Sequence, residues 1–165
     1  MNETIENIMN RISFRRKDDF RKHLLKCIHT STNTKMVSHE EHENVIFKLL
    51  VFLQEFTPFL YEHGKEKKYL SGVEALLITI EELGYEIEKE DVFVLFHLRE
   101  HGRFKVKESK LKEELELLWK SYPEFKLEGN ELSYTLKDLM RKKLINYRKG
   151  NLEINPNVLI RYRQG

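Results

Sequence analysis

Residues 132–154 read LSYTLKDLMRKKLINYRKGNLEI and change from a helical pattern to a strand-like one. Over 133–144, helical spacing gathers the apolar side chains on one side: Leu136, Leu139, Met140 and Leu144. Residues then alternate over Ile145–Arg148 and Leu152–Ile154, and Lys149-Gly150-Asn151 between them is a typical hairpin turn. The sequence therefore predicts a helix that leads directly into a β-hairpin.

Upstream of this stretch the pattern predicts two more helices and a short strand. Asp91 opens a very apolar helix (VFVLFHL) that closes at Gly102, and Arg103–Lys107 alternates like a strand. Ser109 caps the next helix. The turn that follows it, Pro123–Asn130, is longer than the three or four residues usual between paired helices.

The order helix, strand, helix, turn, helix, hairpin over residues 90–160 resembles the winged helix-turn-helix superfamily. Within it, residues 132–154 look like the recognition helix and the wing. The resemblance concerns the fold only, and the sequence does not match one particular family of this superfamily. Lys143 departs from it, because many winged helices have a glycine before the Leu144-Ile145 pair.

The N-terminal half is expected to be helical. Apolar spacing predicts helices over 5–12 and around Phe20–Ile28, with a loop at Thr30–Lys35. Two capping boxes, Ser38 with Glu41 and Ser71 with Glu74, predict the starts of helices that run through Phe56 and to Leu83. The expected fold is thus mainly α. Its two parts are a helical region over 1–88, for packing or dimerisation, and a C-terminal winged helix-turn-helix domain over 89–165 with a small β-hairpin wing.

Charge is distributed unevenly along the 165 residues, although the formal net charge is only +2. Residues 37–100 carry fourteen acidic and six basic side chains, whereas residues 133–165 carry eight basic and two acidic. A polyanion partner requires positive charge on one surface rather than in the total. The basic surplus coincides with the segment that resembles a recognition helix and wing, which favours nucleic-acid binding.

The resemblance implies that the outward face of the helix enters the major groove of DNA and that the hairpin tip lies over the backbone or minor groove. Arg141 can reach guanine acceptors or a phosphate, whereas the lysines suit phosphates. Asp138 on the same face counts against DNA, since a carboxylate repels phosphate. The expected DNA-contacting residues are Tyr134, Thr135, Lys137, Arg141, Lys142, Arg148, Lys149 and Asn151.

The predicted function is therefore binding of double-stranded DNA, sequence-specific or general, by a small transcriptional regulator or accessory factor. The alternative is a non-enzymatic protein-interaction module, an adaptor or inhibitor, on the same scaffold. Surplus apolar helix faces in residues 1–85 predict homodimerisation through that region. The single Cys27 and the short apolar runs, none longer than that of Leu49–Leu53, favour a cytoplasmic protein that does not enter a membrane.

Enzyme chemistry is not expected. His97–His101 (HLREH) fits the H-x-x-E-H zinc motif of the inverzincin peptidases, but Gly102 ends that helix at once, and a helix C-terminus explains a histidine more simply. His39 and His42 lie in an acidic helix start, and Cys27 with His23 lacks a recognisable oxyanion site. Phosphate-binding and nucleophile-elbow glycine motifs do not occur in the sequence. Neither a metal nor a cofactor is predicted.

Overall fold

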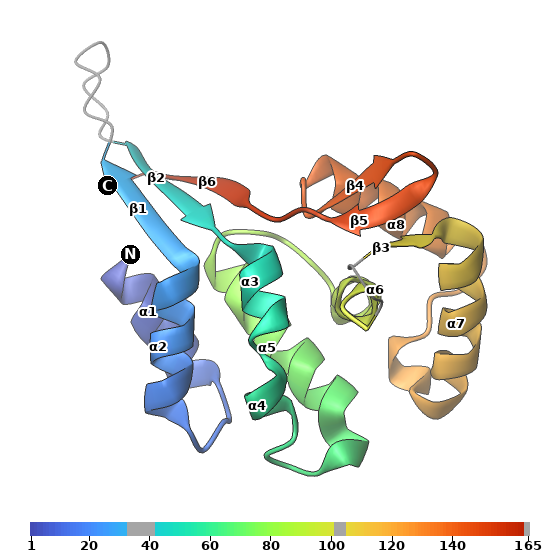
Figure 1. Ribbon diagram of the computed structural model, residues 1–165, viewed down its shortest axis with the longest axis horizontal. Coiled ribbons are helices and arrows are strands. Elements are labelled where there is room, and N and C mark those ends of the chain that lie inside the picture. Colours follow the sequence, from blue (N-terminus) through green and yellow to red (C-terminus); the bar gives the residue numbers. More distant parts are fainter. Residues whose placement is uncertain (33–41, 101–104, 164–165) are drawn as a thin grey trace.

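A computed structural model describes residues 1–32, 42–100 and 105–163 and shows a mainly α-helical chain with two small antiparallel sheets (Figure 1). The helices are α1 (Asn2–Arg11), α2 (Lys17–Cys27), α3 (Leu49–Gln54), α4 (Thr57–Leu60), α5 (Lys68–Glu82), α6 (Lys89–Leu98), α7 (Glu108–Ser121) and α8 (Glu131–Arg141), with 3-10 turns η1 (Lys65–Lys67) and η3 (Pro123–Phe125). The strands are β1 (Ile28–Thr32), β2 (His42–Phe47), β3 (Lys105–Lys107), β4 (Ile145–Arg148), β5 (Asn151–Ile154) and β6 (Val158–Arg163).

The first sheet has the order β1-β2-β6 and corrects the prediction for the N-terminal half. His42–Phe47 is a strand, not the start of the helix expected to run through Phe56, and that helix begins only at Leu49. The burial explains the difference, because Val45 and Phe47 are buried while Ile46 between them is 39% exposed, which is the period of a strand. The capping box at Ser38 and Glu41 lies outside the described residues.

Two further local predictions for this half are corrected. Ile28–Thr32, whose second part was expected to open a loop, forms β1 and pairs with β2. Helix α5 begins at Lys68, so Ser71 and Glu74 lie inside the helix and do not cap it. Polar side chains favour a loop or a helix cap because they can form hydrogen bonds to nearby backbone groups. Here those backbone groups form hydrogen bonds to a neighbouring strand, in β1, or within a longer helix, in α5.

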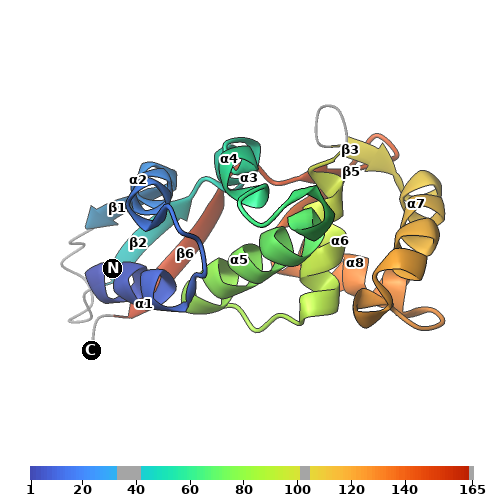
Figure 2. The same ribbon diagram turned by 90° about the horizontal axis from the view of Figure 1, so that it is seen from below.

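Strand β6 carries the C-terminus back to the N-terminal half. It pairs antiparallel with β2, with Val158 opposite Phe47 and Ile160 opposite Val45. The division at residue 88 stays a prediction, but this strand connects the two regions that the division separates. Seen from below, α5 extends from α1 to α6 and connects the same two ends of the molecule (Figure 2).

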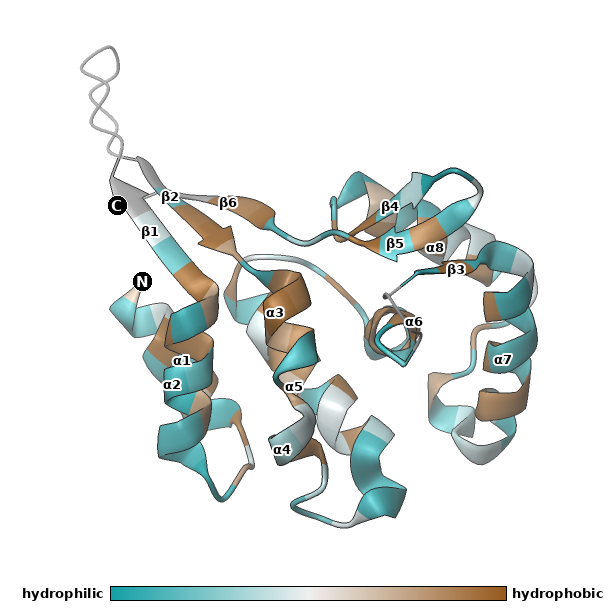
Figure 3. Ribbon diagram, viewed as in Figure 1, coloured by the Kyte–Doolittle hydropathy of each residue, from teal (hydrophilic) through white to brown (hydrophobic). Residues whose placement is uncertain are grey.

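The second sheet has the order β3-β5-β4, so the hairpin β4–β5 gains β3 as a third strand. It lies beside α6 and α8, at the opposite end of the molecule from β1 (Figure 1). Helix α6 is mostly apolar, whereas the tip of the hairpin is hydrophilic (Figure 3). None of the described helices has the length and apolar character that crossing a membrane requires.

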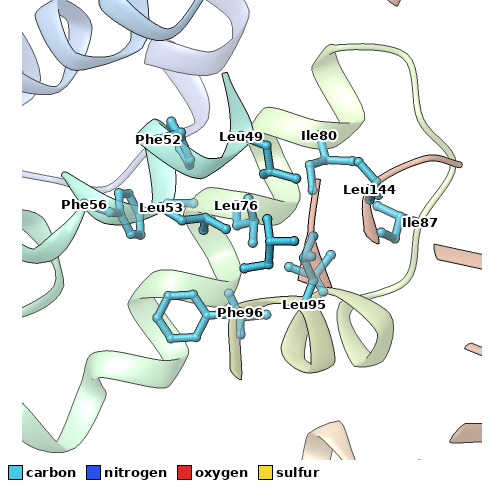
Figure 4. Close-up of a cluster of buried hydrophobic side chains, with 14 of the residues drawn as sticks. Leu49, Phe52, Leu53, Phe56, Leu76, Ile80, Ile87, Leu95, Phe96 and Leu144 are labelled. Atoms are coloured by element: carbon cyan, nitrogen blue, oxygen red, sulfur yellow. The ribbon is translucent and has the colours of Figure 1, made fainter. Parts of the chain in front are cut away.

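A single apolar core joins the two halves. Leu53 and Phe56 from the α3–α4 region, Leu76 from α5 and Phe96 from α6 are all fully buried and lie together (Figure 4). Leu144, which follows α8, reaches the same cluster beside Ile80 and Ile87 (Figure 4). The hairpin and α8 are therefore mounted on the same core as the N-terminal helices.

Candidate functional site

Helix α8 is amphipathic in the way that the sequence predicts. Leu136, Leu139 and Leu144 are buried, and Leu132 at its first turn joins them. Tyr134, Lys137 and Arg141 follow the outward side at spacings of three and four residues, and the tyrosine is 72% exposed. The outward side therefore presents a phenol and two cations in one line.

Thr135 is not on this outward side, which corrects the prediction for that residue. Its side chain is buried, and its hydroxyl donates a hydrogen bond of 2.8 Å to Asp91 Oδ1 at the start of α6. The reason is helical spacing: Thr135 lies three residues after Leu132 and four before Leu139, on the buried stripe. Thr135 therefore fixes α8 against α6 and does not reach a ligand at the surface.

Asp138 is neutralised by the two cations that follow it on α8. Lys142 Nζ lies 2.6 Å from one carboxylate oxygen, and Arg141 bonds to the other. The hydrogen bond from Lys142, with that from Arg141 acting in the same direction, holds the pKa of Asp138 below its usual value. Lys142 also donates to the backbone carbonyl of Glu86, and its side chain is only 18% exposed. Lys142 is thus a structural residue, whereas Arg141, with a side chain 75% exposed, remains accessible.

The exit from α8 has a backbone conformation that glycine favours. Lys143 has φ = 60°, and its carbonyl accepts a 2.7 Å hydrogen bond from Asn155 Nδ2. The backbone N–H of Asn155 donates a second hydrogen bond, of 2.9 Å, to the carbonyl of Leu144. These bonds fix the direction in which β4 leaves the helix, and they leave the Lys143 side chain exposed.

The predicted hairpin turn is confirmed at Lys149 and Gly150. Both residues have positive φ, 51° and 78°, as a two-residue turn between twisted strands requires. Arg148 and Lys149 are exposed at the tip. Asn151 is half-buried, and its amide lies 3.4 Å from the Lys149 carbonyl, so it supports the turn.

The register of the second sheet adds two cations that the sequence analysis missed. Lys105 pairs with Glu153, and Lys107 and Arg148 both pair with Asn151, so all of these side chains share one face of the sheet. The opposite face carries the buried Val106 and Leu152. Alternation in residues 103–107 already indicated a strand, but its pairing partner could not be read from the sequence.

This outer face borders an open groove of about 550 Å³. The groove is lined by the second sheet, by Leu50 and by the segment that leads to β6, and Leu50 N donates a 3.2 Å hydrogen bond to the Pro156 carbonyl. Its lining residues are Leu50, Lys105, Asn146, Tyr147, Arg148, Glu153, Ile154 and Pro156. The cations of the sheet and those of α8 thus lie on accessible surface around the hairpin.

Three of the residues considered for catalysis, His97, Cys27 and His23, are buried within the fold. His97 is buried, with Nδ1 3.0 Å from the Tyr69 hydroxyl and Nε2 2.9 Å from Glu114 Oε2. Burial raises the pKa of the Cys27 thiol to about 12, and His23 bonds through Nε2 to the Phe52 carbonyl at 3.0 Å. His39 and His101 lie outside the described residues. Within the described residues, no group of three or more His, Cys, Asp or Glu side chains is placed to hold a metal ion.

Comparison of the chain with known protein families, curated proteins and solved structures finds no match.

Proposed function

We propose that residues from α6 to β5 form a winged helix that binds double-stranded DNA through α8 and the β4–β5 hairpin. The observation that carries the proposal is the combination of topology and charge. The elements follow in the order helix, strand, helix, helix, hairpin, and the first strand pairs with the last. Lys137, Arg141 and Lys149 are exposed on the helix and the hairpin tip that such a domain places against DNA.

Electrostatics around α8 supports the same proposal. Asp138, the residue that counts against DNA, is compensated by two cations and adds no net repulsion. The guanidinium of Arg141 is exposed, and an ion pair at the surface contributes little to stability. Breaking the pair with Asp138 to bind a phosphate or a guanine therefore costs little free energy. The contact residues we propose are Tyr134, Lys137, Arg141, Lys143, Arg148 and Lys149, with Lys105 and Lys107 nearby.

The test is a fluorescence-anisotropy titration of a labelled 30-base-pair duplex at several salt concentrations. We expect Lys137→Ala/Lys149→Ala to weaken binding about tenfold at low salt and to reduce the slope of log affinity against log salt by about two, because two phosphate contacts are lost. The matched control is Lys65→Ala/Lys67→Ala, which removes the same charge from exposed positions of η1. Equal losses in the two variants, or no duplex binding by the wild type, would refute the proposal.

A protein-interaction module is the second candidate, and one observation favours it. Ile46 and Leu159 are cross-strand neighbours on the outer face of the first sheet, 39% and 60% exposed. The apolar helix faces that suggested dimerisation are instead buried within the chain, as Ile8, Phe20 and Leu24 show. We therefore propose that any homodimer forms through the exposed pair Ile46 and Leu159 and not through the helices.

Analytical ultracentrifugation tests this second candidate. If two copies associate through this sheet, the wild type sediments as a dimer at tens of micromolar, and Leu159→Lys sediments as a monomer because the charge cannot be buried at the interface. Lys120→Ala on α7, far from the sheet, is the control. A monomeric wild type at that concentration would exclude dimerisation through Leu159.

A further inference from the structure

A second groove lies between α7 and the segment that leads into α8. It has a volume of about 490 Å³, within the range of roughly 300–1,000 Å³ in which proteins bind small molecules. In Figure 1 the chain leaves α7 at its lower end and runs back alongside the helix before it enters α8. The lining residues are Lys112, Glu116, Trp119, Lys120, Pro123, Lys126, Leu127, Gly129 and Leu132.

The groove exists because the turn between the two helices is long. Pro123–Phe125 forms η3, and the Phe125 ring stacks on Phe93 of α6 at 4.8 Å, which fixes the start of the turn to the core. Gly129, with φ = 60°, reverses the chain into α8. A turn of three or four residues would bring α8 directly after α7 and leave no room for a groove.

The floor of the groove is apolar. Trp119, Leu127 and Leu132 are each 7% to 8% exposed and line it. The indole Nε1 of Trp119 is shielded from solvent and has no hydrogen-bond partner among the described residues. A buried donor without an acceptor is unfavourable and rare in folded proteins.

The rim of the groove is cationic. Lys112, Lys120 and Lys126 are exposed, and within the described part of the chain none of them lies at ion-pair distance from a carboxylate. Glu116 is the one acidic residue in the lining, so the lining carries a surplus of two positive charges. Unpaired cations around an apolar floor are complementary to a molecule with an apolar body and an anionic group.

We propose that this groove binds a small amphipathic organic anion. Its ring or short chain packs against Trp119, Leu127 and Leu132, and its carboxylate or sulfonate faces Lys120 and Lys126. The site is separate from the proposed DNA contacts and does not depend on them.

Trp119 is the only tryptophan of the chain, so its fluorescence reports on this groove alone. We would titrate the full chain with 4-phenylbutyrate, with its neutral amide as the matched ligand, and follow Trp119 emission. Energy transfer from Trp119 to the fluorescent anion anilinonaphthalene sulfonate provides a second readout. We expect saturable changes with the two anions and at least fivefold weaker binding of the amide, since the amide cannot pair with the lysines.

The variant Lys120→Gln/Lys126→Gln keeps the apolar floor and removes the charge. We expect it to weaken binding of both anions about fivefold to tenfold, while the control Lys65→Gln/Lys67→Gln leaves binding unchanged. Far-UV circular dichroism checks that both variants are folded. Equal affinity for acid and amide, an equal loss in the control, or no response of Trp119 at millimolar ligand would overturn the proposal. A duplex that quenches Trp119 when the small anions do not would assign the groove to nucleic-acid backbone and overturn it as well.

Discussion

At the scale of single residues, Gly72 of α5 permits the close approach of the Phe96 ring of α6. A β-carbon added there would lie 2.4 Å and 2.5 Å from two ring atoms of Phe96 and 3.0 Å from Leu60 Cδ2. Phe96 and Leu60 are themselves fully buried, so the ring has no free space into which to move. The small side chain at 72 is thus a packing requirement and not a requirement of backbone conformation.

Gly72→Ala is expected to lower the free energy of unfolding by up to about 2 kcal/mol. Alanine gains about 1 kcal/mol of helix propensity over glycine, but overpacking against a rigid ring costs about 1–3 kcal/mol and outweighs it. Urea denaturation followed by circular dichroism measures the change. In the Phe96→Leu background the same substitution should cost less, because the ring atoms are gone, and a strictly additive double-mutant cycle would contradict this explanation.

At the scale of elements, features defined by local spacing could be predicted from the sequence and features defined by pairing could not. The helix predicted up to Leu144 and the turn at Lys149 and Gly150 follow from periodicity and turn chemistry within a few residues; the structure has both, although α8 already ends at Arg141. Strand β6 pairs with β2, which lies in the other half of the sequence. No local signal specifies such a pairing, because a strand becomes stable only beside its partner.

In the candidate site too, features set by local spacing could be predicted and features set by packing could not. Lys137, Arg141 and Lys149 were predicted as exposed cations, since a helix face and a turn tip are local properties. Thr135 and Lys142 were predicted to be available, but both are held by groups on α6 or in the segment before it, Asp91 and the Glu86 carbonyl. These contacts depend on how α8 packs against the core, which the pattern of α8 alone does not contain.

At the scale of the whole molecule, the two halves are joined by more than the chain connection. Strand β6 completes the N-terminal sheet, and Arg99 of the segment after α6 donates a 2.6 Å hydrogen bond to the Leu53 carbonyl of α3. Apolar side chains from α3, α5 and α6 and from the segment after α8 share one cluster (Figure 4). A core shared in this way favours unfolding of the entire chain in one step.

This coupling predicts that damage to the first sheet is felt at the opposite end of the molecule. Ile160→Ala in β6 removes a buried side chain and should lower the free energy of unfolding by about 2–3 kcal/mol. Trp119 lies on α7, at the far end from this sheet (Figure 1), so its fluorescence reports on the other half. We expect the urea transitions seen by Trp119 fluorescence and by far-UV circular dichroism to coincide in the wild type and to shift together in the variant. If only the circular dichroism transition shifted, the halves would unfold independently, and the division at residue 88 would mark two separate domains.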